Sequence, residues 1–228
     1  MIINKEALWP LDSEIHVKFL NGEENHKNMV KKYAVEWEEL AAVKFIFDVD
    51  DHSDSQIKIS FNDKGDNRSC VGECKAEITM HLDLVTLTSE ETMRGIILHE
   101  FGHALGLEHE HQHPENSIVW TRDKVYEYFE NKKWSRTDVD KFIFEKFSHE
   151  DKKYFFLKYD KNSIMHYFIL NDWTEDDFEV NFNSYLSELD KEKMKLVTAI
   201  RQVNAATWNV LRKVYNEGDP DFIMRRQL

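Results

Sequence analysis

The sequence predicts an α+β fold, in one domain or two closely packed lobes. Three short segments in the first third of the chain alternate apolar and polar residues with the period of a strand, and longer segments between and after them have helical spacing. The chain has 228 residues and is 41% hydrophobic, with 15 Phe, 8 Tyr and 6 Trp. It is therefore long enough to bury a substantial core and too apolar for a disordered chain.

Net charge excludes some classes of partner. The formal charge is −13 at pH 7, and nucleic acids and anionic membrane surfaces are polyanions, so we expect neither as a partner. No stretch approaches the roughly 20 apolar residues of a membrane span. The first 20 residues lack a signal-peptide core because charges interrupt them, which leaves a cytoplasmic protein or one secreted in mature form. These charges belong to Lys5, Glu6, Asp12, Glu14 and Lys18.

The first expected elements are a strand, a helix and two further strands. Residues 14–20 alternate Ile, Val and Phe with polar residues, which is typical of a half-buried strand. Residues 25–42 place apolar side chains at helical spacing and predict an amphipathic helix over the sheet. Residues 43–49 and 56–61 alternate again and predict two more strands.

Two acidic loops and two cysteines interrupt this pattern. The loop at 48–55 could hold calcium, but its spacing does not match an EF-hand, so we interpret it and the turn at 62–67 as solvated. Cys70 and Cys74 are the two cysteines of the chain. They can close a small local disulfide or stay reduced, and a zinc-ligand role lacks a second pair nearby.

A strand and a helix follow the cysteines. Residues 79–84 (TMHLDL) are, from their own pattern, an ordinary strand. The helix begins near Thr88 or Ser89, each a good N-cap, with acidic residues in its first turn. The apolar side chains of this helix are expected to pack against the sheet on one side and against the rest of the chain on the other. Such packing gives rigid support to any site on the helix.

This helix carries the most informative motif, HEFGHALGLEH at 99–109. Residues four apart share a helix face, so His99 and His103 can reach one metal ion. Glu100 lies beside that face, where it can act on a metal-bound water. Gly106 can adopt the left-handed conformation that ends a helix, and the turn brings His109 back as a third ligand. Three protein ligands with one open position describe a catalytic zinc site.

The alternative is an amphipathic helix with polar surface histidines. With 11 His and 7 Gly in 228 residues, chance placement of this pattern is on the order of one in ten thousand per chain. The alternative also leaves Glu100, Gly106 and His109 unexplained. The sequence therefore favours one Zn²⁺ held by three imidazoles.

The motifs resemble a known family. HExxHxxGxxH followed by a downstream methionine turn is similar to the metzincin clan of zinc peptidases. Glu110 directly after the third histidine, together with Ser163-Ile164-Met165-His166-Tyr167, resembles the astacin family. The likeness extends more weakly over about residues 8–200, and many animal members differ from this chain in carrying two long-range disulfides. Its weaker elements are Trp9, the segment 79–84 and the segment 186–192.

The resemblance implies a metzincin-like fold and its division into parts. An upper lobe would hold a twisted mixed sheet with an edge strand for substrate and two helices, in residues 1–106 including the active-site helix. A mostly helical and irregular lower lobe with the methionine turn would occupy 107–200. Residues 201–228 would form a C-terminal helical extension of the single catalytic domain 1–228. The resemblance also favours a secreted mature form.

The resemblance assigns roles to several further residues. The segment that matches the family's edge strand is 79–84, where substrate backbone would pair antiparallel. Met165 would form a hydrophobic floor beneath the histidines, and Glu110 would lie near a buried mature N-terminus. Tyr167 would ligate zinc at rest and then hydrogen-bond the oxyanion. The candidate substrate-binding residues are Thr79, Met80, His81, Leu82 and Asp83.

The implied activity is zinc-dependent hydrolysis of peptide bonds in proteins. Glu100 would take a proton from the attacking water and pass it to the leaving amine. A monomeric state and a protein or peptide substrate complete this hypothesis. Two alternatives stay open: a zinc-stabilised binding protein that uses a peptidase-like cleft, and a peptidase of another metzincin family.

The sequence after the zinc motif contains two more histidines and predicts several helices. His111 and His113 follow the motif, and we expect them to have surface or supporting roles. Residues 121–131 and 136–147 have helical spacing, and Ser135 with Asp138 forms a capping-box pattern at the start of the second. The same pattern at 187–190 begins a helix to about residue 200, and a further helix is expected at 202–216.

Overall fold

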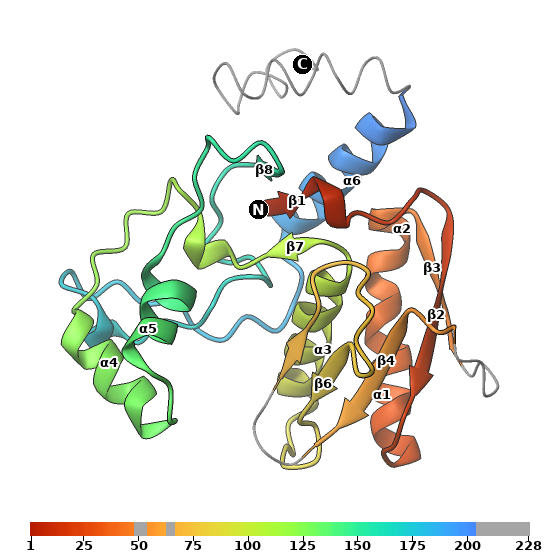
Figure 1. The fold of residues 1–228 in the computed structure, drawn as a ribbon, viewed down its shortest axis with the longest axis horizontal. Coiled ribbons are helices and arrows are strands. Elements are labelled where there is room, and N and C mark those ends of the chain that lie inside the picture. The colour runs from red at the N-terminus through yellow and green to blue at the C-terminus, as the bar shows by residue number, and fades with distance from the viewer. Residues whose placement is uncertain (48–53, 63–66, 204–228) are drawn as a thin grey trace.

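The computed structural model describes residues 1–47, 54–62 and 67–203. Within these ranges it is a mixture of two sheets and several helices, which confirms the predicted α+β class (Figure 1). The predicted loop at 48–55, the turn at 62–67 and the helix at 202–216 fall largely outside the described residues. No helix in the described ranges has the length and apolar character needed to cross a bilayer.

The larger sheet has five strands in the order β3-β2-β4-β6-β5. It contains β2 (Ser13–Phe19), β3 (Val43–Ile46), β4 (Ile57–Phe61), β5 (Arg68–Ser69) and β6 (Met80–Leu82). The pairs β2–β3, β2–β4 and β4–β6 are parallel, whereas β5 runs antiparallel to β6. The sheet is therefore mixed, and its antiparallel strand lies at one edge.

The prediction that residues 79–84 form the edge strand is wrong in this structure. The backbone of β5 pairs with the outer side of β6, so β6 lies inside the sheet. This pairing is extended by a 2.9 Å hydrogen bond from the Cys70 amide to the Thr79 carbonyl. Alternation in 79–84 shows a half-buried strand, but a two-residue strand such as β5 has too little pattern to be recognised.

Two helices pack side by side against this sheet, α1 (Glu24–Ala34) and α3 (Glu90–Ala104) (Figure 1). The helix predicted at 25–42 is divided, because a 3₁₀ turn, η2 (Val35–Trp37), separates α1 from the short α2 (Glu38–Ala41). The fully buried Trp37 side chain donates a 3.0 Å hydrogen bond to the Leu98 carbonyl. The core thereby fastens the middle of α3.

A small sheet that the sequence did not predict connects the two lobes. It has the order β7-β1-β8, with β1 (Ile2–Asn4) between β7 (Leu107–Glu108) and β8 (Tyr154–Phe156), all antiparallel. A 3₁₀ turn, η1 (Lys5–Ala7), follows β1. Because β7 begins directly after Gly106, the N-terminal strand holds the chain where it leaves the active-site helix.

The second lobe has its own aromatic core and lies on the far side of the molecule from the large sheet (Figure 1). It contains α4 (Arg122–Asn131), α5 (Arg136–Val139) and η5 (Asn171–Trp173). The helix predicted at 136–147 is shorter than expected, because α5 continues as a π-helical turn, η4 (Asp140–Phe144), and then ends. The capping box at Ser135 and Asp138 is confirmed.

The last described helix, α6 (Glu188–Gln202), returns to the first lobe. Its predicted capping box at Ser187 and Asp190 is confirmed. Thr198 donates a 2.7 Å hydrogen bond to the Leu40 carbonyl and so joins α6 to α2. The helix therefore spans from the methionine turn of the second lobe to the helices of the first.

Candidate active site

The active-site helix begins and ends where the sequence predicted. Ser89 is the N-cap of α3, and its side chain accepts a 3.3 Å hydrogen bond from the Thr92 amide. Gly106 has φ +94°, and a Cβ there would lie 3.1 Å from the Ala7 carbonyl oxygen. Any other residue would be strained in this conformation and crowded by η1. The glycine therefore turns the chain so that His109 faces back toward the helix.

Three histidines converge at this turn. The ligand nitrogens of His99, His103 and His109 all lie within 4.8 Å of one another, and in the described part of the chain no other group of three or more potential ligands does so. The Nε2 atoms of His103 and His109 are 3.1 Å apart. This spacing is suitable for nitrogen ligands that bind one metal ion together.

Backbone carbonyls orient two of these rings. His99 Nδ1 donates a 2.8 Å hydrogen bond to the Ile164 carbonyl, and His103 Nδ1 donates one of 2.8 Å to the Leu107 carbonyl. With the proton held on Nδ1, the Nε2 lone pair of each ring is available to a metal. The Ile164 carbonyl lies 65 residues along the chain from His99, so sequence reasoning could not name it.

Burial keeps the three imidazoles neutral. It lowers the pKa of His99, lowers that of His103 to about 3, and with the neighbouring histidines lowers that of His109 well below its usual value. Neutral imidazole is the form that binds metal. Three neutral nitrogens that face a common point fit a zinc ion with one position left open.

The methionine turn packs directly beneath the helix. Met165 is fully buried, and a Cβ on Gly102 would collide with its sulfur. The Glu110 amide donates a 2.9 Å hydrogen bond to the Met165 carbonyl, which joins the turn to the segment after the third histidine. Gly102 was not singled out in the sequence, because its small size matters only once Met165 lies against it.

Glu100 and Tyr167 line the same cleft as the histidines. Glu100 is 4% exposed, and the Tyr167 ring lies edge-on to His109 with 5.5 Å between ring centroids. Burial, with a smaller effect from the Glu100 charge, raises the pKa of Tyr167 to about 12. Its hydroxyl therefore remains protonated at neutral pH and can donate a hydrogen bond.

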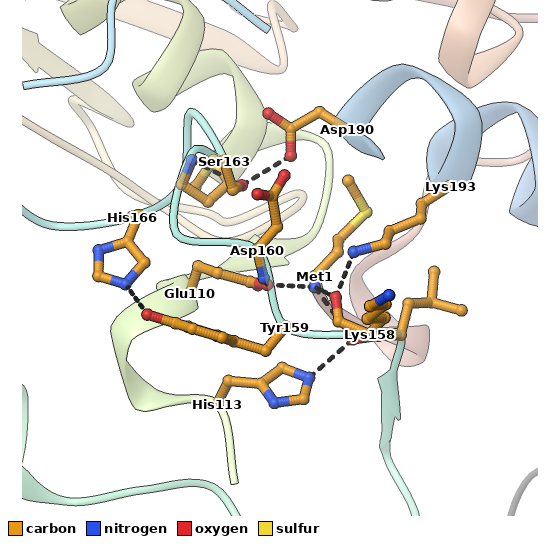
Figure 2. Close-up of polar contacts among 12 residues, drawn as sticks. Met1, Glu110, His113, Lys158, Tyr159, Asp160, Ser163, His166, Asp190 and Lys193 are labelled. Carbon is orange, nitrogen blue, oxygen red and sulfur yellow. Dashed lines mark hydrogen bonds and ion pairs between the residues drawn. The ribbon is translucent and has the colours of Figure 1, made fainter. Parts of the chain in front are cut away.

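Glu110 lies outside the cleft in a buried polar network (Figure 2). Its Oε1 accepts a 2.5 Å hydrogen bond from the Met1 amino group and a 2.9 Å hydrogen bond from the Asp160 amide. The amino group also donates to the Leu157 and Lys158 carbonyls, each at 3.2 Å. Glu110 thus holds β1 and the segment before the methionine turn together.

The two further histidines are buried, so of the two roles expected for them the surface role is wrong and the supporting role remains. His111 Nε2 donates a 2.9 Å hydrogen bond to the Phe142 carbonyl, and its ring lies 5.1 Å from that of Tyr167. His113 Nε2 donates a 2.7 Å hydrogen bond to the Leu157 carbonyl. Each of these hydrogen bonds fastens part of the second lobe, because it gives a buried imidazole a backbone partner in that lobe.

The histidines open into a cleft of about 1110 Å³. Residues of β5 and its flanks form one wall, which includes Asn67, Arg68, Ser69 and Val71. None of the predicted substrate-binding residues lines it. In the described structure Met80 and Leu82 are fully buried, Thr79 and Asp83 nearly so, and His81 pairs with Arg68 inside the sheet.

Comparison with known proteins agrees with this geometry. A protein-family model described as Astacin, a peptidase family, matches residues 1–195. A curated relative, "Zinc metalloproteinase dpy-31" of Teladorsagia circumcincta, is 29% identical over 165 residues, which cover 70% of this chain. The match spans 24% of that relative, so the chain corresponds to about a quarter of its length.

Solved structures show the same relationship. The chain is similar to myroilysin, with a TM-score of 0.80 and 34% identity, over 87% of this chain and 98% of the other. A hatching enzyme of Oryzias latipes, "High choriolytic enzyme 1", shares the fold, with a TM-score of 0.58 and 15% identity, over 86% of this chain and 96% of that one. The resemblance predicted from the motifs is thereby confirmed, and the chain belongs to the astacin family.

Proposed function

We propose that this chain is a zinc-dependent endopeptidase that hydrolyses peptide bonds in protein or peptide substrates. The observation that carries the proposal is the convergence of His99, His103 and His109 within 4.8 Å, in a cleft that Glu100 and Tyr167 also line. Membership of the astacin family supports the same activity. One Zn²⁺ would be held by the three imidazoles.

Each residue of the site has a distinct chemical role in this proposal. Bound zinc supplies a Lewis acid that polarises the scissile carbonyl and acidifies a water molecule. Glu100 accepts a proton from the attacking water and transfers it to the leaving amine. The Tyr167 hydroxyl donates a hydrogen bond to the oxyanion that develops on the carbonyl. The same phenol is the group that would ligate zinc in the resting enzyme.

The substrate would bind along β5 instead of along residues 79–83. β5 is one of the two outer strands of the sheet, and its residues line the cleft. An extended peptide can add to such an edge through main-chain hydrogen bonds, with alternate side chains directed into pockets. Residues 79–83 would then pair with β5 on the side away from the substrate and would not contact the substrate.

The chain would act as one catalytic domain, 1–228, with an N-terminal lobe at 1–106 and a second lobe at 107–200. We propose a monomer, since residues of both lobes of one chain are enough to line the cleft. We also propose a secreted protein. The Cys70–Cys74 disulfide supports this location, because disulfides persist in oxidising compartments.

Digestion of a peptide library, scored by mass spectrometry, tests this function. We expect cleavage by the zinc-loaded protein, loss of cleavage with a chelator, and recovery when zinc is added back. The cleaved positions would also report the preferences of the cleft. Zinc binding without any cleavage would contradict the proposal and would favour a binding protein with a peptidase-like cleft.

A further inference from the structure

The wall of the cleft that would bind substrate is a very short strand. β5 contains two residues, and its ladder with β6 consists of the pairs Arg68–His81 and Ser69–Met80. So short a strand has few hydrogen bonds to hold it in place. At one end the Asp83 amide donates a 2.7 Å hydrogen bond to Asn67 Oδ1. The position of β5 therefore also depends on the contacts at its other end, after Ser69.

At the other end the chain closes into a loop through the Cys70–Cys74 disulfide. Within the loop the Gly72 amide donates a 2.9 Å hydrogen bond to the carbonyl oxygen of His103. That oxygen also accepts a 2.8 Å hydrogen bond from the Gly106 amide. The loop is therefore attached to the backbone of a zinc ligand, at the point where α3 ends.

The loop fits this position closely. Gly72 has φ +70°, and a Cβ there would collide with the carbonyl oxygen of Ala7 and lie 2.7 Å from its Cβ. Only glycine meets both demands, a left-handed backbone and contact with η1. The neighbouring Val71 lines the cleft. A change in the loop would thus move both a cleft wall and the end of β5.

We propose that the disulfide-closed loop Cys70–Cys74 positions the β5 edge for substrate, so that opening the disulfide weakens the binding of extended peptides while zinc stays bound. The inference rests on the proposed peptidase function. Closure limits the conformations of the loop, which keeps the Gly72 amide on the His103 carbonyl and β5 in register with β6. We expect zinc to be retained because His99 and His103 lie on α3, and the carbonyls of Ile164 and Leu107 orient their rings independently of the loop.

Opening requires a reductant. A dithiol such as dithiothreitol supplies two electrons and two protons, is itself oxidised to a cyclic disulfide, and leaves Cys70 and Cys74 as two thiols. The same reagent can remove zinc from a protein. A Cys70→Ser/Cys74→Ser variant is the matched control, because it has no disulfide to lose and keeps the three histidines.

The test compares the oxidised wild-type protein, the reduced wild-type protein and the double serine variant. Kinetics would be measured on one cleavable peptide from the library and on versions of it shortened from either end, with zinc content recorded. For the full peptide we expect KM to rise about five- to tenfold when the disulfide is absent and kcat to stay within about twofold. The rise should vanish when the peptide is shortened on one side, and reoxidation should restore KM.

Other results would overturn the inference. These are an unchanged KM once mass spectrometry has shown both thiols to be free, or a loss of kcat for all peptide lengths together with loss of zinc. If the serine variant does not fold, the reduced wild-type protein gives the same comparison, with reoxidation as its control. Absence of cleavage by the oxidised protein would instead contradict the proposed function itself.

Discussion

The carboxylate of Asp190 accepts a 2.8 Å hydrogen bond from the backbone amide of Ile164, in the turn beneath the three histidines. The carbonyl of the same Ile164 accepts a 2.8 Å hydrogen bond from His99 Nδ1. Asp190 Oδ1 also accepts a 2.6 Å hydrogen bond from the Ser163 hydroxyl (Figure 2). A member of the capping box of α6 therefore also fixes the turn that orients a zinc ligand.

Replacing Asp190 tests this connection. Asp190 is 1% exposed, and Asp190→Ala would leave the Ser163 hydroxyl and the Ile164 amide without their acceptor and remove half of a capping box. We expect the free energy of unfolding to fall by about 2–4 kcal/mol, measured by chemical denaturation, and zinc affinity to fall with it. Glu188→Ala, on the same turn but with a side chain 83% exposed, is the control. Equal stability of the two variants would contradict the connection.

Glu100→Gln separates zinc binding from proton transfer. The amide has the shape of the carboxylate but cannot accept the proton, so kcat should fall by about 10²–10⁴-fold while zinc stays bound. Metal analysis and peptide hydrolysis measure the two properties. The exposed Glu91 on the same helix offers the matched change, Glu91→Gln, which should leave both unchanged. His103→Ala should lose both properties.

Tyr167→Phe removes one hydroxyl from the cleft. Since the pKa of Tyr167 is raised to about 12, the hydroxyl donates a hydrogen bond at neutral pH, and its loss should lower kcat by about 10²–10³-fold with little change in KM. The comparison is Tyr185→Phe, at a residue that is 51% exposed. A Tyr167→Phe protein with wild-type kcat would remove the residue from the mechanism.

His113 should make the fold sensitive to acid. Burial, with a smaller effect from the Met1 amino group, lowers the pKa of His113 from 6.5 to about 3. Between pH 6.5 and about 3 the His113 imidazole therefore binds a proton in the unfolded chain but not in the folded one. The contribution of His113 to the free energy of unfolding is complete above pH 6.5 and is lost as the pH falls toward 3.

The measurement is the free energy of unfolding against pH at a fixed zinc concentration. His113→Gln should reduce the slope by up to about 1.4 kcal/mol per pH unit, the effect of one proton. Parallel curves for the wild-type and His113→Gln proteins would show that His113 does not contribute.

Local spacing determined most of the catalytic group. The i, i+4 relation of His99 and His103, the turn at Gly106 and the N-cap at Ser89 each depend on neighbours within one or two helical turns. Such relations depend only on residues close together in the sequence, so the sequence alone was enough to predict them. The capping box at Ser187 and Asp190 was predictable for the same reason.

Tertiary structure decided which distant groups meet. Residues 79–84 showed the alternation of a strand, yet the strand that covers them, β5, has two residues and becomes an edge only through its pairing with β6. The capping pattern identified Asp190, whereas its contact with Ile164 joins positions 26 residues apart. Contacts of this kind arise when separate elements pack against one another, and no local pattern of side chains records them.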